Sequence, residues 1–304
     1  MEPDRSFGLF GAPPAELCDI PDTAQQFSPL TPGALCLEAL APESLGGLAM
    51  NAPQGTIERR AALAMALRAL HPDAPFAIMA PKDKGGSRLR EELRGFGCTF
   101  EETSKRHYRI CIGLRPAQLE GIDAAVAEGA PRIVEATGLW SQPGIFSWDR
   151  IDPGSALLIA NLPPLSGQGA DIGCGIGVLA HAVLASEKVK QLTLIDIDRR
   201  AIDCARRNVA DARANFRWAD IRNGIALQNL DFVVLNPPFH DGGREDQALG
   251  QEFIRRAAEA LRRNGVCRLV ANRHLAYEAV LAPLFKRLAK IADAGGYKVI
   301  EAQK

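Results

Sequence analysis

The stretch Gly-Gln-Gly-Ala-Asp-Ile-Gly-Cys-Gly-Ile-Gly, residues 167–177, decides the fold of this chain. An apolar segment follows it directly, at residues 178–184. The pattern is typical of a short strand that ends in a tight glycine turn, from which a helix begins. Gly173, Gly175 and Gly177 carry no Cβ, so we expect backbone N–H groups of this turn to approach a ligand at the helix N-terminus.

The spacing of the glycines distinguishes between classes of nucleotide cofactor. A dinucleotide-binding turn has the spacing G-x-G-x-x-G, whereas this turn has Asp171-x-Gly173-x-Gly175-x-Gly177, with a carboxylate in front. It resembles the cofactor loop of the S-adenosylmethionine-dependent methyltransferases of the Rossmann-like class. A nicotinamide-dependent dehydrogenase is disfavoured by this spacing and by the lack of any obvious proton donor. We expect Asp171 to orient the turn and the cationic methionine end of the cofactor.

Length and composition place the chain among ordinary globular proteins. It has 304 residues, enough for two domains, with 47% hydrophobic and 24% charged residues. No apolar stretch reaches the roughly 18–20 residues that cross a bilayer, and the N-terminus lacks the pattern of a signal peptide. The seven cysteines are scattered without a Cys-x-x-Cys pair, which predicts a reducing compartment and no metal site. We expect a cytoplasmic monomer that does not contact membranes.

The charge is balanced overall but differs between the two halves. A net charge of zero argues against a protein that coats nucleic acid nonspecifically. Residues 1–140 contain 14 basic and 18 acidic side chains, whereas residues 141–304 contain 22 basic and 18 acidic ones. The basic excess in the half with the glycine turn gives weak support to a polyanionic substrate there.

The first half, residues 1–140, predicts a smaller α/β domain that cannot bind the cofactor. Strands are expected at 76–80 and 108–113 and helices at 56–70 and 87–96, an alternation typical of α/β folds. Residues before position 46 show no sustained period and are expected to be irregular, with at most a short helix. No glycine turn like that at 173–177 occurs in this half.

The second half, residues 141–304, alternates strands and helices more regularly. This order predicts a mostly parallel sheet with helices on both faces. The first expected strand is the short one that ends in the glycine turn, and the others are 191–198, 216–220, 231–235, 266–271 and 297–302. The expected helices after the first turn are 199–209, 247–263 and 275–288.

Polar side chains end four successive strands of this predicted sheet. They are Asp171, Asp196, Asp220 and Asn236, and ligands of such sheets bind at the carboxyl ends of the strands. Any one of them is explained by the preference of Asp and Asn for the first positions of loops, where their side chains bond nearby backbone amides. Four of them at successive strand ends favour a ligand-binding site. Asp196 lies 19 residues after Gly177, where a carboxylate accepts the ribose hydroxyls, and Asp220 would meet the adenine amino group. Asp198 is instead expected to cap a helix.

The tetrapeptide Asn236-Pro237-Pro238-Phe239 follows the fourth strand and resembles the [DNS]-Pro-Pro-[FYW] motif of methyltransferases that modify conjugated nitrogens. An amine conjugated to a ring is a poor nucleophile because its lone pair is delocalised. The side-chain oxygen of Asn236 and the carbonyl of Pro237 can accept its two N–H bonds and localise that pair. The ring of Phe239 can stack on the base. The alternative for this segment is a turn made rigid by proline.

The motif extends to Asn236-Pro237-Pro238-Phe239-His240-Asp241-Gly242, which is similar to the signature of the RsmC-like ribosomal RNA guanine-N2 methyltransferases of the small subunit. Further agreement lies at 143–147, 152–155, 270–272 and 297–299. The resemblance covers residues 143–304 and implies a seven-stranded class I methyltransferase sheet. It also implies that the first half is a degenerate copy of that fold.

The same resemblance implies the reaction, transfer of a methyl group from S-adenosylmethionine to the N2 amine of a guanine in 16S ribosomal RNA. The partner would be ribosomal RNA or the small subunit, and Phe146 and Ser147 would line the methionine end of the cofactor. Other acceptors remain open: guanine N2 of large-subunit RNA, adenine N6 or a protein glutamine amide. A noncatalytic assembly factor that keeps the cofactor pocket is the alternative from a different class.

Overall fold

The computed structural model describes residues 6–238, 240–241, 244–245 and 247–304. The chain divides into two compact units, Met1–Pro131 and Arg132–Lys304, whereas the boundary expected from the sequence follows residue 140. Within the described part of the chain, no helix is long and apolar enough to cross a bilayer. No group of His, Cys, Asp and Glu side chains in the same residues is suited to hold a metal ion.

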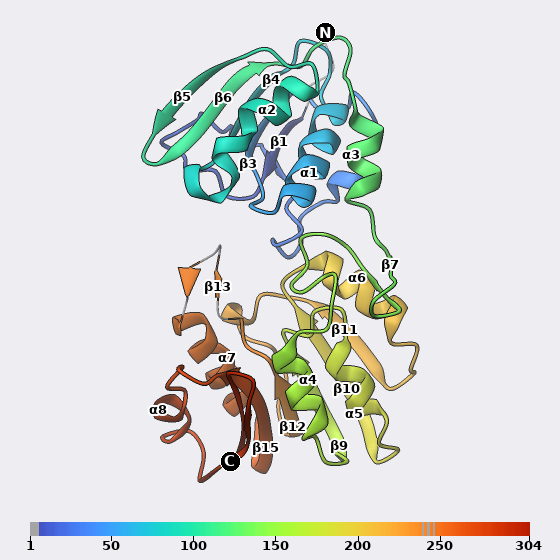
Figure 1. Ribbon diagram of the computed structural model, residues 1–304, viewed down its shortest axis with the longest axis vertical. Helices are drawn as coiled ribbons and strands as arrows, with labels where there is room; N and C mark the ends of the chain where they lie inside the picture. The colour runs from blue at the N-terminus through green and yellow to red at the C-terminus, as the bar shows by residue number, and fades with distance from the viewer. Residues whose placement is uncertain (1–5, 239, 242–243, 246) are drawn as a thin grey trace. The chain divides into compact units, whose positions relative to one another are not determined.

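The second unit is built on a seven-stranded sheet in the order β11-β10-β9-β12-β15-β17-β16 (Figure 1). Six of the seven strands run in the same direction, and β17 runs antiparallel to both of its neighbours, so the predicted seven-stranded, mostly parallel sheet is confirmed. The strands are β9 (Gly167–Ile172), β10 (Val189–Asp196), β11 (Ala214–Trp218), β12 (Leu230–Leu235), β15 (Leu261–Asn272), β16 (Arg287–Ala294) and β17 (Tyr297–Gln303).

Helices cover both faces of this sheet because its strands are apolar on both sides. Along β12, Phe232 and Val234 belong to one hydrophobic cluster, whereas Val233 and Leu235 belong to another, as the two-residue period of a strand requires. The first cluster includes residues of α4 (Pro153–Ala160), α5 (Val178–Leu184) and α6 (Arg199–Asn208). The second includes residues of α7 (Gln247–Ala260) and α8 (Glu278–Leu281).

One element of the second unit was wrongly predicted. The helix expected at 275–288 is reduced to the short α8, and the segment Arg287–Ala294 forms β16 at the edge of the sheet. Its side chains are mostly exposed, so it lacks the hydrophobic alternation that identifies a half-buried strand. The remaining short elements here are the pairs β7 (Arg132–Val134) with β8 (Leu139–Ser141) and β13 (His240–Asp241) with β14 (Arg244–Glu245), and the 3₁₀ helix η3 (Ile221–Asn223).

The first unit contains a six-stranded sheet in the order β2-β1-β3-β4-β6-β5. It includes two strands, β1 and β2, in the region expected to be irregular. The strands are β1 (Phe7–Phe10), β2 (Gln25–Gln26), β3 (Gly47–Asn51), β4 (Pro75–Pro81), β5 (Phe100–Lys105) and β6 (Tyr108–Leu114). The helical elements are η1 (Leu37–Ala39), α1 (Thr56–Ala69), a π-helical turn η2 (Lys82–Gly86), α2 (Ser87–Gly95) and α3 (Ile122–Glu128).

Candidate active site

A small pocket of about 50 Å³ lies at the carboxyl ends of β9 and β12, where the glycine turn meets the segment after β12. It brings together five of the residues singled out from the sequence: Phe146, Ser147, Gly173, Gly175 and Asn236. The other lining residues are Arg150, Asp152, Ser155, Cys174, Ile176, Val178 and Leu179.

The glycine turn has the backbone that its sequence requires. Gly173, Gly175 and Gly177 have φ of 74°, 52° and 88°, in the left-handed region that favours glycine. A Cβ on Gly175 would meet nothing within 4 Å, so it would project into open space at the pocket.

The expectation that the turn offers its N–H groups to a ligand is wrong for four of its residues. The N–H groups of Gly173 and Cys174 donate to the carbonyl of Ile195, at 2.8 and 3.0 Å. That of Gly175 donates to Asp196 Oδ2 at 2.8 Å, and that of Gly177 to the carbonyl of Cys174 at 2.9 Å. These groups hold the turn against β10, and the glycines contribute space rather than donors.

Asp171 is fully buried near the end of β9, with both carboxylate oxygens unpaired within the described structure. Burial, and secondly the charge of Asp196, raises the pKa of Asp171 from 3.8 to about 8. A buried carboxylate without hydrogen bonds is costly, and a cation or a hydrogen-bond donor placed beside it would remove that cost. The side chain therefore suits the positively charged end of a ligand.

Asp196 ends β10 and already accepts two backbone hydrogen bonds. Its Oδ2 accepts from Gly175 and its Oδ1 from the N–H of Asp198, at 2.8 and 2.9 Å. Burial raises its pKa to about 6, while these backbone hydrogen bonds limit the rise. A carboxylate offers about four lone-pair positions, so Asp196 keeps acceptor capacity for ribose hydroxyls.

The neighbouring Asp198 caps α6, as predicted. Its Oδ1 accepts from the N–H of Arg200 at 2.9 Å, and both of its oxygens bind the Arg200 guanidinium. Asp220 lies two residues after β11 and likewise caps η3, and it pairs with Arg222 at 2.8 Å. Neither side chain lines the pocket.

The side-chain nitrogen of Asn236 is hydrogen-bonded, whereas its side-chain oxygen has no partner in the described residues. Nδ2 donates to Asp152 Oδ2 and to Ser155 Oγ, both at 2.9 Å, and the buried Oδ1 has no partner in the described part of the chain. The free oxygen belongs to a pocket residue, which is the arrangement needed to accept an N–H of a substrate amine. Pro237, the next residue, is buried, and Phe239 lies outside the described residues.

Sequence reasoning missed Asp152 and Ser155 as site residues. Besides the family agreement at 152–155, the local signal is the Asp-Pro pair that begins α4, where Asp152 is the N-cap and accepts from the N–H of Ser155 at 2.8 Å. That signal predicts a helix start and says nothing about Asn236, which lies 84 residues further along the chain.

Phe146 and Ser147 lie on the loop before α4. The Phe146 side chain is 66% exposed although the adjacent Ile145 is buried, so the loop is anchored and presents an aromatic ring beside the pocket. Ser147 has φ of 50°, and its Oγ donates to the carbonyl of Arg150 at 3.0 Å.

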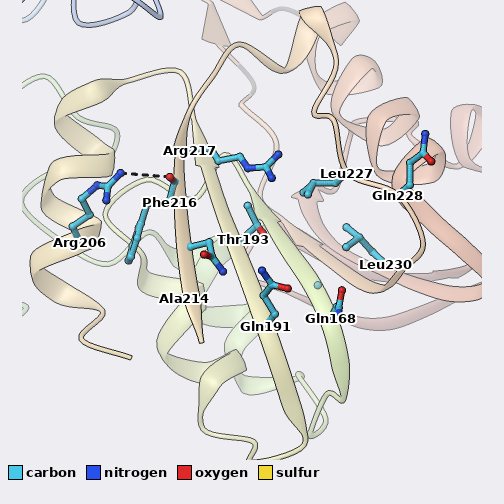
Figure 2. Close-up of a pocket in the computed structure, with 12 residues that line it drawn as sticks. Gln168, Gln191, Thr193, Arg206, Ala214, Phe216, Arg217, Leu227, Gln228 and Leu230 are labelled. Atoms are coloured by element: carbon cyan, nitrogen blue, oxygen red, sulfur yellow. Dashed lines mark hydrogen bonds between the residues drawn. The ribbon is translucent and has the colours of Figure 1, made fainter. Parts of the chain in front are cut away.

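A larger pocket of about 400 Å³ lies elsewhere on the same sheet and contains none of the predicted site residues. Figure 2 shows Gln168, Gln191 and Thr193 on neighbouring strands, with Leu227 from the segment before β12 and Leu230 at the start of β12. Gln168, Gln191 and Ala214 come from the amino-terminal parts of their strands. Ligands of open α/β sheets bind at the opposite ends, so we assign the active site to the smaller pocket.

The chain matches the family described as methyltransferase small domain over residues 136–301. It is similar to the protein named ribosomal RNA small subunit methyltransferase C of Shewanella baltica strain OS155, at 38% identity over 160 residues, 51% of this chain and 45% of the relative. The protein of the same name from Pseudomonas aeruginosa strain LESB58 is 31% identical over 250 residues, 80% of this chain and 74% of the relative. The chain thus spans about half the length of the Shewanella relative.

A solved structure is similar to both units. It is the T. thermophilus 16S rRNA N2 G1207 methyltransferase (RsmC) in complex with AdoMet and guanosine, with a TM-score of 0.81 and 23% identity. The match covers 100% of this chain and 89% of that one. At this identity the similarity shows a shared fold.

Proposed function

This chain belongs to the ribosomal RNA small subunit methyltransferase C family, and from that premise we propose that it methylates the exocyclic N2 amine of a guanine in 16S ribosomal RNA, with S-adenosylmethionine as the methyl donor. The observation that carries the proposal is the Asn236 carboxamide, whose oxygen is buried, unpaired in the described structure and located at the pocket of the glycine turn.

The glycine turn and the two carboxylates beside it fit the cofactor, although neither Asp171 nor Asp196 lines the pocket itself. Asp171 offers two buried oxygens without partners in the described structure, which suits the cationic methionine end. Asp196 keeps lone pairs for the ribose hydroxyls, and the open space beside Gly175 leaves room for a ligand. When bound, S-adenosylmethionine would supply a methyl group made electrophilic by the attached sulfonium.

The work of the chain is to place the amine and to make it nucleophilic. Asn236 Oδ1 accepts one N–H of the base amine, and the carbonyl of Pro237 is the expected acceptor for the other. Both acceptors draw the amine out of conjugation with the ring, which localises its lone pair. Direct displacement needs no covalent nucleophile, so positioning provides most of the rate. Cys174 is buried and burial raises its pKa far above the usual value, which excludes a thiolate there.

The proposal has three further parts, which concern the cofactor, the partner and the place of action. The cofactor binds the unit Arg132–Lys304 only, with Asp220 near its adenine and Phe146 and Ser147 near its methionine end. Ribosomal RNA, free or in the small subunit, is the partner. The protein acts in the cytoplasm as a monomer.

The test uses S-adenosylmethionine with a deuterated methyl group. The protein is incubated in parallel with small subunits, large subunits and naked RNA, and the nucleosides are read by mass spectrometry. Labelled N2-methylguanosine from small-subunit RNA alone is the expected result. Label on another nucleoside or on protein would keep the chemistry and reject the acceptor, and cofactor binding without any label would favour the assembly factor.

A further inference from the structure

Asn236 makes two hydrogen bonds that determine which way its carboxamide faces. Its two amide protons are matched by two acceptors, Asp152 Oδ2 and Ser155 Oγ, each 2.9 Å from Nδ2. We propose that Asp152, supported by Ser155, is a positioning residue that fixes the orientation of this carboxamide and thereby restricts the site to substrates that present a hydrogen-bond donor.

The orientation follows from the chemistry of a carboxylate, which accepts hydrogen bonds and cannot donate them. If the Asn236 amide were rotated by 180°, Oδ1 would face Asp152 Oδ2 as a second acceptor. The amide protons would then point toward the pocket. A hydroxyl such as that of Ser155 tolerates either orientation because it both donates and accepts. The selection therefore comes from Asp152, and Ser155 takes up the second proton.

Asp152 is held in place by the start of α4. Its Oδ2 also accepts from the N–H of Ser155 at 2.8 Å, so one oxygen both caps the helix and binds Asn236. Gly154 lies beside this contact: a Cβ there would be 2.9 Å from the Tyr297 ring and 3.0 Å from Asp152 Oδ2. The glycine thus leaves room for the carboxylate to reach Asn236.

The consequence for recognition rests on the proposed function. With Nδ2 held by the protein, the acceptor Oδ1 is the part of the Asn236 amide that remains for a substrate. An exocyclic amine presents N–H donors and is accepted, whereas a carbonyl or a ring nitrogen with a lone pair would place two acceptors against each other. The negative charge of Asp152 behind the amide also favours the positive charge that develops on the amine during transfer.

Two substitutions of Asp152 distinguish its role in orienting Asn236 from its role as the N-cap of α4. Serine and asparagine are both good N-cap residues, so Asp152→Ser and Asp152→Asn both preserve the start of α4. Serine is too short to reach Asn236, whereas asparagine keeps a neutral acceptor at the same distance. Asp149→Ser is the matched control, since Asp149 lies on the same loop, is half exposed and pairs with Arg150.

The measurements are kcat and KM on the RNA acceptor, the cofactor Kd by calorimetry and thermal unfolding. We expect Asp152→Ser to lower kcat by about tenfold to hundredfold, with the cofactor Kd and the KM near those of the wild type. Asp152→Asn should recover most of this loss, and the control should match the wild type. Equal kcat for the serine and asparagine variants, or a loss expressed only in the cofactor Kd, would overturn the proposal.

A second readout needs no RNA. A double-mutant cycle of Asp152→Ser with Asn236→Ala, measured by urea unfolding, reports the coupling between the two side chains. We expect the effects to be non-additive, and additive effects would reject the contact. Coupling in this cycle together with no methyl transfer by the wild-type protein would reject the proposed function and keep the positioning role of Asp152.

Discussion

The two units of this chain contain separate sheets of the same topology, and they differ in the side chains at the carboxyl ends of the strands. Six strands follow the same order and directions in both: β2-β1-β3-β4-β6-β5 in the first unit corresponds to β10-β9-β12-β15-β17-β16 in the second. In both, an asparagine lies at the carboxyl end of the third strand of this shared order: Asn51 is the last residue of β3, and Asn236 follows β12 directly. The framework of the site is therefore present twice.

The strand registers identify what the first unit lacks. Leu9 pairs with Ala49 two residues before Asn51, as Asp171 pairs with Val234 two residues before Asn236. On the neighbouring strand, Gln26 pairs with Leu9, which places Ser28 where the second unit has Asp196. An apolar and a neutral side chain thus replace the two carboxylates. Asn51 Nδ2 donates to the carbonyl of Ala12 at 3.4 Å instead of to a carboxylate.

The largest effect is expected from removing the Asn236 amide, to which we assign the substrate amine, in comparison with its counterpart in the first unit. Asn236→Ala removes the acceptor of the amine and should lower kcat by about 10²–10³-fold or more, with the cofactor Kd near that of the wild type. Asn51→Ala, its counterpart in the first unit, should leave methyl transfer within about twofold. Isotope-labelled transfer assays and calorimetry measure both. An equal loss of transfer and cofactor affinity in Asn236→Ala would show that its role is misassigned.

The next largest effect is expected from giving the second unit, at position 171, the side chain that the first unit has at the equivalent position. Asp171→Leu reproduces the side chain found at Leu9 and removes the carboxylate that we propose pairs with the cationic part of the cofactor. A hydrogen bond to a charged group contributes about 1.5–3 kcal/mol, so the cofactor Kd should rise by roughly 10–150-fold. Calorimetry with S-adenosylmethionine measures this. An unchanged Kd would contradict the assignment of Asp171 to the cofactor.

The pKa of Asp171 adds a dependence on pH that the first unit cannot show. Burial raises the pKa of Asp171 from its usual 3.8 to about 8 in the folded protein. Between these pH values the side chain is protonated in the folded state and ionised in the unfolded state. The free energy of unfolding should therefore fall as pH rises through this window, by up to about 1.4 kcal/mol per pH unit. Urea unfolding from pH 5 to 9 measures the slope, which Asp171→Leu should reduce.

Cofactor affinity should change with pH in the opposite direction. In the proposed site the ionised form of Asp171 pairs with the cationic end of the cofactor, so the Kd should decrease as pH rises toward 8 and level off above it. Calorimetric titrations across this range test the sign. A Kd independent of pH in the wild-type protein would exclude Asp171 as the group that ionises on binding.

The smallest effects are expected from substituting two glycines, Gly175 and Gly11, each of which lies after the first strand of its sheet. Gly175→Ala meets open space but has φ of 52°, which costs about 1–2 kcal/mol for alanine. Gly11→Ala, with φ of 70°, would also place its Cβ 2.9 Å from the carbonyl oxygen of Asn51. We expect the second variant to be the less stable in thermal unfolding, while only the first weakens cofactor binding by a few-fold. Weaker binding in Gly11→Ala would contradict the division of roles.

Much of the second unit was predictable because its signals are local. The strand β12 is apolar on both faces and is followed directly by Asn-Pro-Pro, and the G-x-G-x-G turn has a spacing that few other structures need. The edge strand β16 was missed because exposed strands carry no hydrophobic period, and β1 and β2 were missed because they are short and lie among prolines and small residues.

The sequence by itself determined the class of fold, the glycine turn and the set of polar residues at the carboxyl ends of the strands, since period and spacing are properties of neighbours along the chain. Only the tertiary structure decided what those residues do with their hydrogen bonds. In the folded chain, N–H groups of the turn donate hydrogen bonds to Ile195 and Asp196, and Asp171 is buried without a partner in the described structure. The fold also places Asp152 within hydrogen-bond distance of Asn236. Hydrogen bonds and burial depend on distances in space, and residues 84 positions apart leave no local pattern that predicts their contact.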